Sequence, residues 1–275
     1  MPLVADVIQR LEAFAPTHLA EDWDNVGLLW GDRQLPVQRI LTCLTLTAEV
    51  AEEAIARDVQ LVVAHHPLPF QPLRQVTTDT ATGLVLWRLA RAGIAIYSPH
   101  TAFDSTSGGI NDQLAAALEL HEVVSLVPSA TSDGEPTPQA VGGGRIGTTA
   151  EPTTLRQLAE GLMEFLQIDH VRVVGEDQQP VELVAIACGS GSSLFDQAVA
   201  RGAGVIVTGE ASFHSLLSLQ AAGVAAILTG HYASERFALE WLAQWIASQL
   251  PSCEVAASHK ECDPLRLVLR DTESR

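Results

Sequence analysis

Lysine is almost absent from this chain of 275 residues: Lys260 is the only one, and the other basic residues are arginines. Schiff-base catalysis and phosphate binding by a P-loop lysine both need an ammonium group in the body of a domain. The 16 basic residues are outnumbered by 33 acidic residues, which gives a net charge of −17. Because nucleic-acid binding needs a basic surface, we expect neither lysine chemistry nor a nucleic-acid partner.

Long apolar runs and closely spaced cysteines are missing as well. No run reaches the roughly 18 apolar residues of a membrane helix, and the first residues lack the pattern of a secretory signal. We therefore expect a cytoplasmic protein with no membrane partner. Cys43, Cys188, Cys253 and Cys262 show no C-x2-C spacing, which argues against a cysteine-bound structural zinc.

Apolar runs alternate with helical patterns along most of the chain. The apolar runs predict strands at 39–46, 60–66, 93–99, 182–188, 204–209 and 223–230. The helical patterns lie at 3–15, 47–58, 79–93, 192–202 and 234–250. Strands that alternate with helices of this length are typical of an α/β fold with largely parallel sheets.

The chain also contains two similar halves. The segments 56–63 and 200–207 match in spacing and character, and His100-x3-Asp104 in the first half corresponds to His231-x3-Glu235 in the second. Residues 128–144 are rich in Pro, Gly, Ser and Thr, which is typical of a linker or long surface loop. We therefore expect duplicated α/β lobes at 1–127 and 145–275, although chance similarity of short apolar strands is an alternative explanation.

Histidines and acids gather where the expected strands end. His65, His66, His100 and His231 follow buried strands, at the edge where open α/β sheets bind ligands. His231 and Glu235 share one face of a helix, and we expect Asp104 on a loop. Adjacent histidines at a strand end point to opposite sides, so His65 and His66 suit two ions, or one ion approached from two sides of a kink. This nitrogen and oxygen donor set suits two divalent ions of Zn, Fe, Mn, Co or Ni.

Other residues have two open interpretations. Asp24 either orients a metal-binding imidazole or caps a turn. The turn Gly189-Ser190-Gly191 opens a helix and either cradles an anion or is a plain tight turn. Glu210 takes the place in the second half that His66 takes in the first, and we expect it to partner a site residue or to contact the substrate.

Five short motifs resemble one known family. They are WDNVG (23–27), HHP (65–67), HTAFD (100–104), VTGE (207–210) and GHYASER (230–236). In order and character they resemble the NIF3-like (NGG1-interacting factor 3-like) family, whose bacterial members are often named GTP cyclohydrolase 1 type 2 homologs. The resemblance covers the chain from about residue 3 to its C-terminal strand. It implies the short form of a two-lobed protein, without an inserted middle domain.

The resemblance also implies a dinuclear metal centre that faces the internal cavity of a toroidal homohexamer. Carried over by motif, the metal ligands are His65, His66, Asp104, His231 and Glu235, with His100 beside the metals. One departure lies at CLTLT (43–47), where relatives commonly have an acid.

The expected activity is metal-dependent hydrolysis of a nucleotide or a related small anionic molecule, such as opening of the imidazole ring of GTP. A metal-dependent phosphoesterase and a non-catalytic metal-binding scaffold are the alternatives. The net negative charge does not exclude an anionic substrate, because two divalent ions would leave a locally positive pocket.

Overall fold

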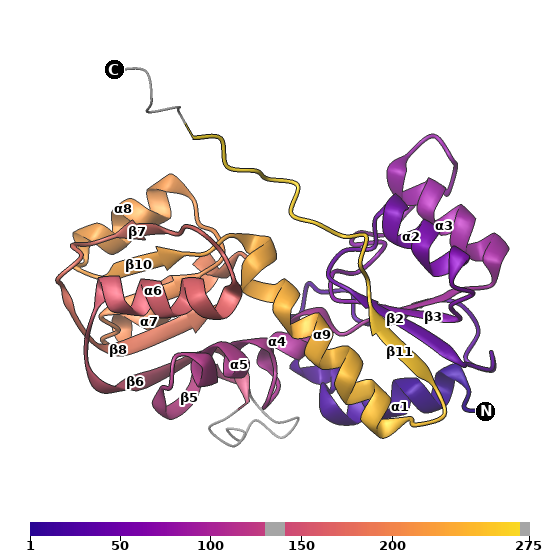
Figure 1. Cartoon of the computed structure of the whole chain (residues 1–275), viewed down its shortest axis with the longest axis horizontal. Helices are drawn as coiled ribbons and strands as arrows, with labels where there is room; N and C mark the ends of the chain where they lie inside the picture. Colours follow the sequence, from indigo (N-terminus) through magenta and orange to yellow (C-terminus); the bar gives the residue numbers. More distant parts are fainter. Residues whose placement is uncertain (130–140, 270–275) are drawn as a thin grey trace.

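The apolar runs form the middle strands of two separate β-sheets in the computed structural model, which describes residues 1–129 and 141–269 (Figure 1). The first sheet has the order β1-β4-β3-β2-β11. Its strands are β1 (Gly27–Trp30), β2 (Arg39–Cys43), β3 (Leu61–Ala64), β4 (Ala95–Ser98) and β11 (Glu254–Ala257). All are parallel to their neighbours except β1, which runs antiparallel to β4. Every residue of β3 and β4 is buried, which explains their unbroken apolar sequence.

The second sheet is mixed, with the order β5-β6-β8-β9-β10-β7. Its strands are β5 (His121–Pro128), β6 (Gly142–Thr154), β7 (Arg172–Val174), β8 (Pro180–Ala187), β9 (Val205–Thr208) and β10 (Ala225–Leu228). Only β8, β9 and β10 pair in parallel, while β5, β6 and β7 pair antiparallel. The expected α/β class and the two lobes are confirmed, and the parallel part of the second sheet is limited to its middle strands.

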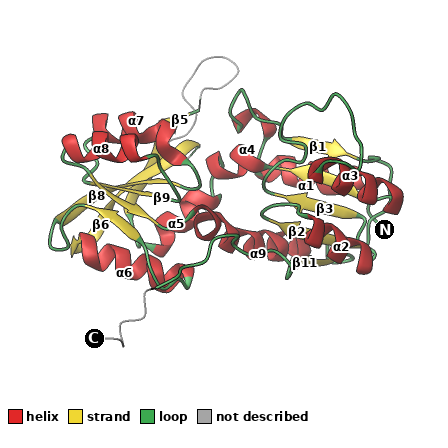
Figure 2. Cartoon of the chain, turned by 90° about the horizontal axis from the view of Figure 1, so that it is seen from above, coloured by secondary structure: helices red, strands yellow, loops and turns green. Residues whose placement is uncertain are grey.

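Helices cover both faces of each sheet (Figure 2). The helices are α1 (Val4–Phe14), α2 (Ala48–Ala56), α3 (Ala81–Ala92), α4 (His100–Ser105), α5 (Ile110–Ala117), α6 (Leu155–Leu166), α7 (Phe195–Ala200), α8 (Phe213–Ala221) and α9 (His231–Gln249). Short 3-10 turns precede β1 and α7, at Thr17–Leu19 and Gly191–Leu194.

Three apolar clusters form the core. One joins α2 and α3 to the first sheet, and another joins α7 and α8 to the second sheet. The largest runs along α1, α5, α6 and α9 through both lobes. No helix of the described segments is long and apolar enough to span a membrane.

Each lobe contains the same unit of three parallel strands and two helices. In the first lobe the order is β2-α2-β3-α3-β4, and in the second it is β8-α7-β9-α8-β10. His65 and His100 follow β3 and β4, whereas Glu210 and His231 follow the corresponding β9 and β10. The repeat seen in the sequence therefore corresponds to a repeated unit of structure.

The sheets divide the chain differently from the expected boundaries. β5 precedes the expected linker at 128–144 but pairs with β6 in the second sheet, and β11 returns to the first sheet after the long helix α9 (Figure 1). The composition shift thus lies between two paired strands of one sheet. Its central part, 130–140, lies outside the described residues.

The paired tryptophans of α9 belong to the core. Trp241 and Trp245 pack on the ring of Phe14 from α1, with centroid distances of 5.5 and 4.7 Å. Trp241 also stacks on Phe103 of α4 at 6.3 Å. These contacts pack α1, α4 and α9 against one another, so the position of α4 and of its side chains is fixed.

Candidate metal centre

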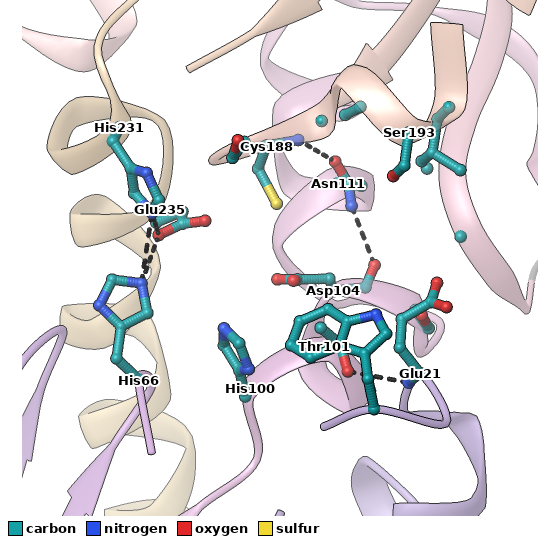
Figure 3. A pocket seen from close by; sticks show the side chains of 18 of the residues that line it. Glu21, His66, His100, Thr101, Asp104, Asn111, Cys188, Ser193, His231 and Glu235 are labelled. Atoms are coloured by element: carbon teal, nitrogen blue, oxygen red, sulfur yellow. Dashed lines mark hydrogen bonds and ion pairs between the residues drawn. The ribbon is translucent and has the colours of Figure 1, made fainter. Parts of the chain in front are cut away.

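A cavity of about 580 Å³ lies where the strand ends of the two lobes meet. His66, His100 and Asp104 line it from the first lobe, and His231 and Glu235 line it from the start of α9 (Figure 3). Carboxyl ends of parallel strands converge in this way in open α/β sheets. The duplicated units therefore bring imidazoles and carboxylates from distant parts of the chain into one cavity.

One group of donors is centred on Glu235. Its Oε2 lies 3.1 Å from His66 Nε2 and 3.1 Å from His231 Nε2, and the two imidazole nitrogens are 3.3 Å apart. The other ring nitrogen of each histidine has its own partner: His66 Nδ1 lies 2.7 Å from Thr45 Oγ1, and His231 Nδ1 lies 2.9 Å from Glu210 Oε1. These outer partners orient both Nε2 atoms toward Glu235, the arrangement that metal-binding imidazoles require.

The second group contains buried atoms that lack a partner. His65 is fully buried, and neither of its ring nitrogens is hydrogen-bonded to any described residue. Its Nε2 lies 3.6 Å from Asp104 Oδ1, which is also buried and unpaired, and 4.0 Å from Glu235 Oε2. Leaving buried polar atoms unpaired is costly, and native proteins rarely do so. A cation between these donors would satisfy them.

His100 completes the donor set at a strained position. The backbone of His100 has a φ of +26°, in a region that side-chain-bearing residues rarely adopt. Its Nδ1 lies 2.7 Å from Asp24 Oδ1, and the backbone amide of Thr101 donates to Asp24 Oδ2 at 3.1 Å. Asp24 therefore orients an imidazole, as one of the two sequence interpretations proposed.

Two sets of ligand atoms are close enough to hold a metal ion. One set is formed by His65, His66 and His100, and the other by His66, His231 and Glu235. Within each set the ligand atoms lie within 4.8 Å of one another, and His66 belongs to both sets. His65 and His66 do not lie on opposite sides of the strand as expected, because β3 ends at Ala64: their ring centroids are 5.2 Å apart, and both offer a nitrogen to the same group of ligand atoms.

The electrostatics of the site favour a bound cation. Burial and the nearby charge of Glu235 raise the pKa of Asp104 to about 7. Burial holds the pKa of His65 well below its usual value. The hydrogen bond to Glu235 raises the pKa of His231 to about 9 against the effect of burial. The hydrogen bonds from His231 and His66 lower the pKa of Glu235 against the effect of burial, so Asp104 is the carboxyl group whose ionisation a bound cation would favour.

Comparison with known proteins places this chain in a family. The sequence profile of Duf34/NIF3 (NGG1p interacting factor 3) matches residues 2–264. The chain belongs to the Duf34/NIF3 family. The resemblance expected from the five motifs is thereby confirmed.

Relatives within the Duf34/NIF3 family cover nearly the whole chain. A protein of Drosophila melanogaster named NIF3-like protein 1 is 35% identical over 274 residues, which is 98% of this chain and 90% of that protein. A GTP cyclohydrolase 1 type 2 homolog of Clostridium acetobutylicum is 33% identical over 232 residues, 84% of this chain and 85% of the relative. The crystal structure of a Bacillus cereus protein related to NIF3 superposes with a TM-score of 0.87 at 25% identity, covering 97% of this chain and 99% of the other.

The glycine turn of this family member does not offer its amides to an anion. The backbone amides of Cys188, Gly189 and Gly191 donate to Asn111 Oδ1, Ser234 Oγ and Thr208 Oγ1 at 2.9, 2.9 and 3.3 Å. Gly189 has a φ of +59°, and a Cβ there would collide with Glu235 Oε1. These contacts favour the tight-turn interpretation: the turn makes room for Glu235, and its residue Ser190 lines the cavity.

Several site residues carry no sequence signal. Asn111 of α5 donates to the backbone oxygen of Asp104 at 3.1 Å and accepts from Cys188, which ties the two lobes together beside the cavity (Figure 3). Glu261 accepts from the amides of Leu44 and Thr45 at 2.8 and 3.2 Å and so holds the residue that orients His66. Thr45 could have been noticed, because it lies near the end of the expected strand at 39–46, as His65 and His66 do at 60–66. Asp104 lies on the short helix α4 and not on a loop as expected.

Proposed function

We propose that this Duf34/NIF3 protein is a dinuclear metal-dependent hydrolase that acts on a nucleotide or a related small molecule. The observation that carries the proposal is the set of buried, unpaired donor atoms on His65 and Asp104, facing Glu235. Burying such a group without a partner is costly, and a positive charge between the donors would offset that cost. The chemistry of the donors, imidazole nitrogens and carboxylate oxygens without thiolates, suits catalytic rather than structural metal ions.

The residues that would hold two divalent ions are His65, His66, Asp104, His231 and Glu235, with His100 adjoining. When bound, such a metal pair activates water and stabilises negative charge on the group under attack. Glu235 lies within 4.0 Å of three imidazoles, which suits a carboxylate shared between two ions. Thr45 and Glu210 keep the outer nitrogens of His66 and His231 occupied, so that the Nε2 atoms stay available.

The Asp24 and His100 pair supplies a proton-transfer group beside these donors. Burial alone would lower the pKa of His100, but the hydrogen bond to Asp24 and the charge of Asp104 outweigh it and raise the pKa. With Nδ1 held by Asp24, Nε2 of His100 is the atom that would take a proton from the attacking water or return it to the leaving group. Asp24 orients the imidazole and stabilises its charged form.

The substrate class in this proposal is supported by the name GTP cyclohydrolase 1 type 2 homolog that several relatives carry. Hydrolytic opening of a purine imidazole ring needs water activated beside a planar base, which the cavity can accommodate. A homohexamer is part of the same proposal, and light scattering of the purified protein tests it: a mass near 29.4 kDa, that of one chain, would contradict it.

The decisive experiment measures metal content and turnover together. Protein purified without chelator is loaded with Zn, Mn, Fe, Co or Ni, its bound metal is counted by mass spectrometry, and nucleosides, nucleotides and simple phosphoesters are screened for products. We expect about two ions per chain and turnover of a nucleotide-like compound. Glu235→Gln should lose both metal and turnover.

The matched control is Glu240→Gln, because Glu240 lies on the same helix at the surface, where it pairs with Arg236. That variant should keep its metal and its activity. Fewer than two ions at saturating metal would contradict the dinuclear site. Two bound ions with no turnover of any compound would support the non-catalytic scaffold instead.

A further inference from the structure

Two large aromatic rings are exposed beside the candidate metal centre. Trp23 and Phe70 keep 59% and 48% of their surface accessible, although both line the cavity. Their ring centroids are 5.9 Å apart, and each lies about 6 Å from the ring of His100, at 6.0 and 6.1 Å. Because the two rings contact each other, they form one continuous apolar wall and do not face each other across a gap into which a ligand could insert. Exposed aromatic surface of this kind beside a polar site is typical of a ligand contact.

Polar contacts at the base of this wall hold it in place. Asn25 Nδ2 donates to the backbone oxygen of Pro69 at 2.8 Å, which joins the loop of Trp23 to the loop of Phe70. The backbone amide of Glu21 donates to Thr101 Oγ1 at 3.0 Å, and Asp24 is bonded to His100. The wall is thus fixed to the same residues that orient His100, while its rings stay open to the cavity.

The rest of the cavity lining suits a flat and uncharged group. Gly143, Gly144 and Gly191 contribute backbone alone, Ala187 and Leu194 are apolar, and Ser190 and Ser193 add hydroxyl groups. Among the described residues that line the cavity, none is lysine or arginine, whereas Glu21 adds a carboxylate to those of Asp104 and Glu235. Residues 130–140 contain no basic residue either.

With no lysine or arginine among the described lining residues, a triphosphate would find its cationic partners in the metal ions and in the imidazole of His100. Binding there would occupy the positions that an attacking water needs, and the carboxylate of Glu21 would repel the rest of its charge. A planar heterocycle, in contrast, gains stacking on Trp23 and Phe70 and needs no cation. Stacking of a base on an aromatic side chain is a strong and sequence-tolerant contact.

We propose that Trp23 and Phe70 form a stacking wall for the planar nitrogen heterocycle of the substrate, and that the ligand class is an uncharged nucleobase or nucleoside rather than a nucleoside triphosphate. The proposal rests on the proposed function for the identity of the site and adds to it the chemistry of the substrate. Trp23 and Phe70 act in binding and orientation, so that the heterocycle lies against His100 and the metal donors.

Calorimetric titration of the metal-loaded, full-length protein with guanosine, adenosine and GTP tests this inference. We expect at least one nucleoside to bind, and GTP to bind no more tightly than that nucleoside. Trp23→Ala and Phe70→Ala should each weaken nucleoside binding by roughly tenfold or more, whereas Trp23→Phe should retain most of the affinity. Metal content is measured on every variant and should not change, because neither ring is a donor.

Trp87→Ala and Phe213→Ala are matched controls, since both residues are exposed on helices outside the cavity. Their affinities should equal that of the wild type. The inference is overturned if neither nucleoside binds, if the two alanine variants of the wall bind like the wild type, or if GTP binds more than tenfold more tightly than either nucleoside. The calorimetric measurement of binding does not depend on turnover. If the alanine variants lose nucleoside affinity but no product forms, the proposed function is contradicted and the stacking wall is not. If the protein turns over substrate but the alanine variants bind like the wild type, the stacking wall is contradicted and the proposed function is not.

Discussion

Thr45 Oγ1 lies 2.7 Å from His66 Nδ1, so a neutral hydroxyl holds the outer nitrogen of this imidazole. The hydroxyl can fix the ring with its proton on Nδ1, which leaves Nε2 to face Glu235 at 3.1 Å. Thr45→Val keeps the shape of the side chain and removes this partner. We expect metal affinity to fall by about 10- to 100-fold, measured by competition with a chelator.

Folding should be little affected by this substitution, because Thr45 is exposed at the strand end. Thr148→Val, a change of the same kind in β6 away from the cavity, should leave metal affinity unchanged. Equal affinities of the Thr45 variant and the wild type would show that the hydroxyl does not orient His66.

Asp24 provides the corresponding test for His100. In Asp24→Asn the amide no longer carries the charge that stabilises a protonated imidazole, and its NH2 group competes with the backbone amide of Thr101. We expect turnover to fall by about 100-fold, the usual contribution of a positioned acid or base, while the number of bound metal ions stays the same. Asp22→Asn, two residues away and exposed, is the control. Loss of bound metal together with activity would show that His100 acts mainly as a metal ligand and not as a proton-transfer group.

Much of this site was predictable because its donors follow buried apolar strands. The runs at 60–66, 93–99 and 223–230 predict strands, and the carboxyl ends of parallel strands share an edge, so His65, His100 and His231 could be brought together from the sequence alone. Their joint orientation was not predictable. Alternation along a strand placed His65 and His66 on opposite sides, but β3 ends at Ala64, two residues before the end of the expected strand, and the chain bends there.

The missed edge strands share a physical cause. β1, β7 and β11 are short edge strands of three or four residues, and β5 carries polar residues at its start, so none shows a long apolar period. Asn111 and Glu261 act through hydrogen bonds to segments 77 and 217 residues away in the chain. Contacts of this kind follow from the packed fold and leave no pattern in neighbouring residues.

Gly189 is expected to be intolerant of any side chain. Gly189→Ala forces a Cβ into collision with Glu235 Oε1 and also strains a backbone with φ +59°. Gly93→Ala is the matched control, because Gly93 has φ +69° at the end of α3 and nothing lies within 4 Å of the point that its Cβ would occupy. We expect both variants to lose about 1–2 kcal/mol of unfolding free energy from the backbone. Only Gly189→Ala should also lose metal affinity, because Glu235 must move.

Arg145 is a buried cation that fastens β6 to the helices beside the site. It is fully buried, pairs with Asp112 of α5, and donates to the backbone oxygen of Thr106 at 2.8 Å. Asp112→Asn would remove the carboxylate charge that faces this buried guanidinium, so we expect the free energy of unfolding, measured in urea, to fall by up to about 3–5 kcal/mol. Glu160→Gln removes one partner of the exposed Arg156 and should cost less than about 1 kcal/mol. Similar losses in both variants would contradict a special role for the buried pair.

His65 offers the sharpest separation between stability and metal binding. Its two ring nitrogens are buried and unpaired, so in metal-free protein they weaken the fold, whereas a bound ion would turn them into ligands. His65→Leu removes both nitrogens at similar volume. In excess chelator we expect the variant to be at least as stable as the wild type. In metal at about 100 times its dissociation constant, the wild type alone should gain about 2.7 kcal/mol, measured by urea unfolding under both conditions. A variant that is much less stable in chelator would show that the imidazole of His65 supports the fold without metal.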